Sequence, residues 1–115
     1  MKYREFSNVG WKVSEIGIGC WAIGSEWGDV SPENAKDALF SSLDNGVNFF
    51  DTADVYGDGR SEKFIGEILK NTKEKIYVAT KAGRRLDPHV SEGYNIKNIE
   101  AFIDRSLLNL GIDSI

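Results

Sequence analysis

The chain has 115 residues, a net charge of −4 and 41% apolar residues. This length and apolar content fit one globular domain, and the acidic balance, without a cluster of basic residues, argues against nucleic acid as a partner. Cys20 is the one cysteine and cannot form an internal disulfide, which favours a cytoplasmic location. No segment reaches the ~18 consecutive apolar residues of a membrane span and no signal peptide is apparent, so no membrane partner is expected.

A hairpin and a short strand are expected at the N-terminus. Residues 3–6 and 11–13 flank the turn residues Asn8 and Gly10, a pattern typical of two antiparallel strands. Isoleucines then alternate with glycines over residues 16–19, which predicts a compact strand before a long loop.

Three helices are expected, each with a recognisable start. The predicted N-caps are Ser31, Ser61 and Asn95, and Pro32 after Ser31 suits the first helical position. The third helix should end at Gly111, because glycine readily adopts the left-handed conformation of a helix C-terminus. Apolar residues recur with helical spacing after each cap and form the predicted buried faces: Ala35, Ala38, Leu39 and Leu43; Phe64, Ile65, Ile68 and Leu69; Ile96, Ile99, Phe102, Ile103, Leu107 and Leu110.

Strands are expected between these helices. Residues 47–51 and 76–81 are rich in β-branched and aromatic side chains, and a further strand would start at residues 112–115. The resulting alternation of strands and helices predicts a parallel sheet with right-handed crossovers.

Two architectures fit this alternation, a dinucleotide-binding fold and an incomplete (β/α)8 barrel. The motif GIGCWA at residues 17–22 satisfies the loose dinucleotide fingerprint, and Asp51 lies where a ribose-binding acid would be. That fingerprint requires the helix to begin inside the motif, whereas here it begins near Pro32. Unusual residues gather instead in the loops after the strands, as they do in a barrel. The sequence therefore favours the barrel.

Three polar residues should meet at the carboxyl edge of the sheet. Asp51 and Lys81 end two predicted strands, and Tyr56 follows Asp51 in the next loop. An ammonium beside a phenol favours the ionised phenol, which makes tyrosine a better general acid near neutral pH. Asp51 would keep Lys81 charged and oriented. We therefore predict that Tyr56 protonates a carbonyl oxygen; a plain ion pair at the strand ends, with Tyr56 packed in its loop, is the alternative.

These segments resemble the aldo-keto reductase family. GVNFFDTADVYGDGRSE (46–62) is similar to the family signature around its catalytic aspartate and tyrosine, and IYVATKAG (76–83) resembles the strand that carries its lysine. GIGCWAIG (17–24) resembles the first barrel strand and its loop, and LLNLGIDSI (107–115) resembles the approach to the fourth. The hairpin, residues 1–14, resembles the plug at the bottom of that barrel.

The resemblance implies an α/β fold, a (β/α)8 TIM barrel, of which residues 1–115 would supply about the first three and a half β/α units. It implies reduction of aldehydes or ketones with NADP(H), a small-molecule carbonyl substrate and no metal. The site residues that it implies are Asp51, Tyr56 and Lys81 for catalysis, Gly19, Cys20, Trp21 and Asp51 for the cofactor, and Trp21 for the substrate.

A non-catalytic function is left open by these residues. Such a protein would resemble the cytoplasmic β subunits of potassium channels, in which a bound nicotinamide serves regulation or assembly. The family's catalytic histidine and most of its cofactor-binding residues would lie beyond Ile115, and His89 is expected to be a loop residue. The isolated chain is expected to be inactive, and its open sheet edges should favour self-association or pairing with the missing half-barrel.

Four further residues near the predicted site are weaker candidates. Trp27 and Tyr94 could form part of the pocket wall. Arg84 and Arg85 follow Lys81 and either contact an acidic substrate or lie in a solvated loop.

Overall fold

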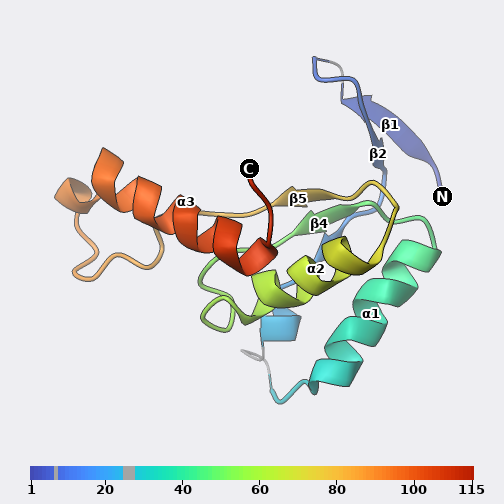
Figure 1. The fold of residues 1–115 in the computed structure, drawn as a ribbon, viewed down its shortest axis with the longest axis horizontal. Helices are drawn as coiled ribbons and strands as arrows, with labels where there is room; N and C mark the ends of the chain where they lie inside the picture. Colours follow the sequence, from blue (N-terminus) through green and yellow to red (C-terminus); the bar gives the residue numbers. More distant parts are fainter. Residues whose placement is uncertain (7, 25–27) are drawn as a thin grey trace.

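The computed structural model describes residues 1–6, 8–24 and 28–115. Strands β3, β4 and β5 form one sheet in that order, and both pairs are parallel, as predicted. Figure 1 shows β4 beside β5. The antiparallel pair β1 and β2 forms the predicted N-terminal hairpin. The elements in chain order are β1 (Tyr3–Phe6), β2 (Trp11–Ser14), β3 (Ile18–Gly19), the 3₁₀ turn η1 (Ala22–Gly24), α1 (Pro32–Asp44), β4 (Phe49–Asp51), α2 (Arg60–Asn71), β5 (Tyr77–Ala79), the 3₁₀ turn η2 (Ser91–Gly93) and α3 (Ile96–Leu110).

The hydrophobic core contains residues of the sheet and of all three helices. Phe50, the central residue of β4, is fully buried, as are Leu39 of α1 and Ile65 of α2. Each such side chain contributes roughly 1.5–3 kcal/mol through removal of its apolar surface from water. The buried cluster consists of Cys20, Ile23, Ala35, Leu39, Val47, Phe50, Phe64, Ile65, Ile68 and Leu110.

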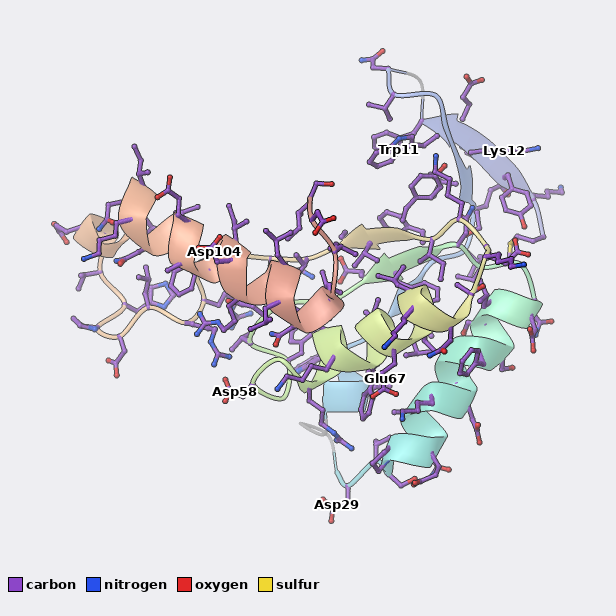
Figure 2. All side chains as sticks on the ribbon, viewed as in Figure 1. Trp11, Lys12, Asp29, Asp58, Glu67 and Asp104 are labelled. Atoms are coloured by element: carbon purple, nitrogen blue, oxygen red, sulfur yellow. The ribbon has the colours of Figure 1, made fainter. Side chains whose placement is uncertain are left out.

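The face of the sheet opposite Phe50 carries Asp51, one of the predicted site residues, and contacts the hairpin. Side chains alternate along a strand, so Phe49 and Asp51 of β4 lie on the face opposite Phe50. Phe49 pairs in register with Tyr77 of β5. Trp11 stacks on Tyr77 with 4.8 Å between ring centroids, so the hairpin lies against the amino end of the strands. Figure 2 labels Trp11 beside the hairpin.

Two of the three predicted helix starts are confirmed. The side chain of Ser31 accepts a hydrogen bond from the Asn34 amide at 3.1 Å, and Asn95 accepts one from the Asn98 amide at 3.1 Å. The predicted end of α3 is also confirmed, because Gly111 has a left-handed φ of 66°.

The predicted cap of α2 is wrong. The helix begins two residues earlier than predicted, at Arg60, and its N-cap is Gly59, which has a left-handed φ of 85°. Ser61 lies inside the first turn and is fully buried. Its hydroxyl lies 2.8 Å from Thr52 Oγ1 and donates to the Cys20 carbonyl at 2.9 Å. Ser61 therefore joins α2 to the ends of β3 and β4 instead of capping its own helix.

Parts of the predicted apolar faces are also wrong. Ala38 of α1 is exposed, and on α3 Ile96 and Ile103 are 77% and 38% exposed. These helices bury narrower stripes than the sequence predicts, because α3 packs mainly on α2 and projects beyond it (Figure 1). Residues 112–115 form no strand with any described residue; Ile112 packs against the core instead.

Candidate active site

Lys81 lies at the centre of the predicted site. Asp51 ends β4 opposite Ala79 of β5, so Lys81, two residues further along, extends over the same edge of the sheet. Its ammonium donates to Asp51 Oδ1 at 2.7 Å and to the Thr52 carbonyl at 2.8 Å. These contacts bring together two of the three residues predicted to be catalytic.

The electrostatic environment keeps Lys81 protonated. Partial burial alone would lower the pKa of Lys81, but the hydrogen bond and the charge of Asp51, with a smaller contribution from Tyr56, raise it above its ordinary value. The two side chains are 41% and 47% exposed, so solvent screens the pair and its contribution to stability is small. The pair therefore matters less for stability than for holding a cation at the edge of the sheet.

Tyr56 completes the group of three predicted residues. The Lys81 ammonium lies 5.3 Å from the centre of the Tyr56 ring, within the range of a cation–π contact. Trp21 stacks on Tyr56, with 6.2 Å between the two ring centroids. Asp51, Lys81, Tyr56 and Trp21 thus form one continuous set of contacts.

The loop that carries Tyr56 has an unusual backbone. Gly57, Asp58 and Gly59 are consecutive residues with left-handed φ values of 58°, 54° and 85°. A Cβ on Gly57 would lie 2.3 Å from the Gly24 carbonyl oxygen, so no side chain fits there. Asp58 is not a glycine and adopts this region at some cost in energy.

Arg85, from the loop after β5, compensates for this conformation. Its guanidinium donates to the Asp54 carbonyl at 3.0 Å and forms an ion pair with the Asp58 carboxylate. Figure 2 labels Asp58 on the turn before α2. Arg85 therefore binds the Tyr56 loop on both sides of the tyrosine.

Glu62 and Asp54 are buried acids near the site that the sequence analysis did not identify. Glu62 is fully buried and accepts hydrogen bonds from Thr80 at 2.7 Å and from Asn109 at 2.9 Å. The signal for Glu62 was its position on the apolar stripe of α2, three residues before Ile65. Asp54 is also fully buried, and neither of its carboxylate oxygens has a well-formed hydrogen bond; the nearest described cation is Arg105, at 3.9 Å.

Asp54 should make stability depend on pH. Burial, followed by the charge of Glu62, raises the pKa of Asp54 in the folded state. The folded protein therefore binds this proton more strongly than the unfolded chain, and the resulting stability is complete below about pH 3.9 and is lost as pH rises through the raised value. We expect Asp54→Asn, which mimics the neutral acid, to increase the urea midpoint relative to the unmodified protein more at neutral than at acidic pH.

The matched control is Asp104→Asn, on the exposed side of α3 (Figure 2). This control should show no such pH-dependent difference. An Asp54→Asn difference that is constant with pH would contradict the raised pKa.

Gly19 ends β3 at the same edge, and Cys20 and Trp21 follow it. Gly19 pairs in register with Asp51, and a Cβ on Gly19 would meet nothing within 4 Å. The Cys20 side chain is 1% exposed, and burial, together with the negative charge of Asp51, raises the pKa of its thiol to about 12. Its amide donates to the Asp51 carbonyl at 2.8 Å. Gly19 and Trp21 thus present open surface, whereas Cys20 joins β3 to β4.

A small pocket opens beside Tyr56. Its volume is about 160 Å³, and its lining residues are Trp21, Val55, Tyr56 and Arg84. Tyr94 is not among them: it is 50% exposed, and its hydroxyl lies 2.7 Å from His89 Nε2 in the loop before α3. Trp27 lies outside the described residues.

The described residues contain neither a metal-binding cluster nor a membrane-spanning helix. Within residues 1–6, 8–24 and 28–115, no cluster of three or more His, Cys, Asp or Glu side chains is placed to hold a metal ion. No helix in the same residues combines the length and the apolarity that a membrane crossing needs.

Comparison with known proteins identifies close similarity over the whole chain. The profile of the Aldo/keto reductase family matches residues 15–115. An uncharacterized oxidoreductase of Bacillus subtilis, YqkF, is 34% identical over 119 residues, which cover 100% of this chain and 37% of the relative. The aldo-keto reductase yakc [NADP(+)] of Schizosaccharomyces pombe is 37% identical over 109 residues, 90% of this chain and 32% of the relative.

Solved structures agree with this result. The holo form of aldo-keto reductase AKR11C1 from Bacillus halodurans superposes with a TM-score of 0.81 at 31% identity, over 100% of this chain and 38% of that one. The structural neighbours are (β/α)8 barrels, so the predicted fold class is confirmed, and the chain spans about a third of the length of these proteins. The chain belongs to the aldo/keto reductase family.

Proposed function

We propose that this chain supplies the proton-donating part of the active site of an oxidoreductase that reduces aldehyde or ketone carbonyls to alcohols with NADP(H). The observation that carries the proposal is the set of contacts around Lys81, which lies 2.7 Å from Asp51 and 5.3 Å from the centre of the Tyr56 ring. Family membership supports an oxidoreductase, and the geometry of these three side chains supports their individual roles.

Tyr56 donates the proton in this proposal. Reduction of a carbonyl adds a hydride to carbon and a proton to oxygen, and negative charge develops on the oxygen as the hydride arrives. A phenol with an ammonium beside it can donate its proton while the ammonium stabilises the charge that remains. Asp51 and the Thr52 carbonyl hold that ammonium in place.

The residues at the end of β3 fit the nicotinamide end of the cofactor. Gly19 has open space where a side chain would be, and Trp21 is 41% exposed. A flat ring could therefore approach the backbone of residues 19–21 next to Asp51, and bound NADPH would supply the hydride there. Cys20 would contribute through the backbone, because its thiol is buried.

We further propose that residues 1–115 are the N-terminal part of one barrel domain, with residues 1–14 as the plug at its base. The matched relatives are much longer, and β3 and β5 each pair only with β4 among the described residues. Exposed edges of this kind bind further strands. The isolated chain should therefore lack activity and either self-associate or pair with the remaining part of the barrel.

The test is a steady-state assay of the complete protein that contains this chain. Reduced nicotinamide should be consumed in the presence of simple aldehydes, faster with NADPH than with NADH, and equimolar alcohol should form. Binding of NADPH without consumption over the aldehyde panel would contradict the proposed enzyme and support the regulatory alternative. The same assay on residues 1–115 alone should show no turnover.

A further inference from the structure

The loop after β5 carries two adjacent arginines with different surroundings. The Arg85 side chain is 20% exposed, donates to the Asp54 carbonyl at 3.0 Å and forms an ion pair with Asp58. Both of its terminal nitrogens, Nη1 and Nη2, are therefore engaged within the protein. Arg84, by contrast, is exposed and lines the pocket beside Tyr56.

Arg84 is a cation at this pocket without a described counter-ion. Lys81 is matched by Asp51 at 2.7 Å, and Arg85 is matched by Asp58. No described residue forms an ion pair or a side-chain hydrogen bond with Arg84. Because the whole chain has a net charge of −4, its overall charge does not attract anions, and any preference for them must come from a local group such as this one.

The remaining pocket wall is suited to the uncharged part of a ligand. Trp21 and Tyr56 are stacked at 6.2 Å, and Val55 adds an aliphatic surface. The volume of about 160 Å³ is small and both Tyr56 and Arg84 line it, so a ligand that reacts at Tyr56 would have its other end close to Arg84. The planar guanidinium has the geometry to donate two parallel hydrogen bonds to a carboxylate.

We propose that Arg84 binds a carboxylate of the substrate, so that the preferred substrates are carbonyl compounds that also bear a carboxylate. The proposal rests on the proposed function, since it assigns a substrate class to the same pocket. Arg84 contacts the unreactive end of the substrate and sets specificity, whereas Tyr56 acts on the carbonyl oxygen.

The test compares two substrates of the same skeleton, para-carboxybenzaldehyde and its uncharged methyl ester, with the complete protein. A charge-assisted hydrogen bond is worth about 1.5–3 kcal/mol, which corresponds to roughly a 10- to 100-fold preference in kcat/KM for the acid. Arg84→Gln should abolish most of this acid-to-ester ratio, and Arg84→Lys should restore part of it because it keeps the charge. The control Arg4→Gln, at an 82% exposed side chain on the hairpin, should leave both rates unchanged.

The outcomes separate this inference from the proposed function. Measurable reduction of both aldehydes with an acid-to-ester ratio near one, or a ratio that Arg84→Gln does not change, overturns the role of Arg84 and leaves the reductase proposal standing. If neither aldehyde is reduced, the reductase proposal fails, and calorimetric titration with para-(hydroxymethyl)benzoate decides the role of Arg84. Equal affinity of the unmodified and Arg84→Gln proteins for this carboxylate would overturn it; weaker binding by Arg84→Gln, with Arg4→Gln unaffected, would support it.

Discussion

If the proposed function holds, Tyr56→Phe should lower kcat of the complete protein by roughly 10²- to 10⁴-fold, the range that a positioned general acid contributes. The substitution removes the hydroxyl but keeps the ring that stacks on Trp21 and lies beside Lys81. KM for the aldehyde and the affinity for NADPH should change much less, because the shape of the pocket is retained. Single-turnover measurements with bound NADPH would show the loss in the chemical step itself.

The matched control is Tyr3→Phe on the hairpin. Tyr3 donates one hydrogen bond, to the Gly46 carbonyl at 2.9 Å, so the control also removes a bonded phenolic hydroxyl. It should cost about 1 kcal/mol of stability and leave kcat unchanged. If Tyr56→Phe retains the unmodified rate, another group donates the proton and the assigned role of Tyr56 is wrong.

Lys81→Met should lower kcat by about 10²- to 10³-fold, comparable to the loss of one preorganised donor at a developing negative charge. It removes the ammonium while keeping an unbranched side chain, and it leaves Asp51 Oδ1 and the Thr52 carbonyl without their donor. Because the proposed role of Lys81 is to act on the proton held by Tyr56, the two losses should not add. The double variant should be no slower than the slower single variant within about threefold.

Lys12→Met is a matched control for Lys81→Met, because the Lys12 ammonium also lies over a tyrosine ring, 5.7 Å from the centre of Tyr3 (Figure 2). It should leave kcat unchanged. Additive losses in the double variant would show that the two residues act independently.

The raised pKa of Lys81 also sets the pH range in which its contacts hold. Its interactions in the folded state are complete below about pH 10.4 and are lost as pH rises through the raised value.

Much of the fold could be predicted because local signals and the core pattern agree. Ser31 and Asn95 each accept a hydrogen bond from the amide three residues further along the chain, and Gly111 adopts the backbone conformation that its residue type favours. Ser61 misled the prediction, because its hydroxyl bonds residues of two other segments, and sequence spacing carries no information about such partners. Ile96 was also misplaced, since helical spacing identifies an apolar stripe but not how far the neighbouring helix extends.

Part of the candidate site could also be predicted from the sequence. The contact between Asp51 and Lys81 follows from parallel strands, whose carboxyl ends lie at one edge. The surroundings of Asp54 and Glu62 were not predictable, because their partners Arg105 and Asn109 come from α3, far along the chain. Periodicity identifies which face of a helix is buried, but it does not identify which polar group on a later element will meet it.

The bond between Arg85 and the Tyr56 loop has a consequence for the range of usable ligands. Arg85 adjoins Arg84 and is fixed to Asp54 and Asp58, on either side of Tyr56. These contacts therefore restrain the backbone of the proposed proton donor, Tyr56, relative to the backbone that carries Arg84, the proposed carboxylate-binding residue. Compounds whose carbonyl and carboxylate match the spacing between Tyr56 and Arg84 should react fastest. Compounds longer or shorter by one methylene should react more slowly.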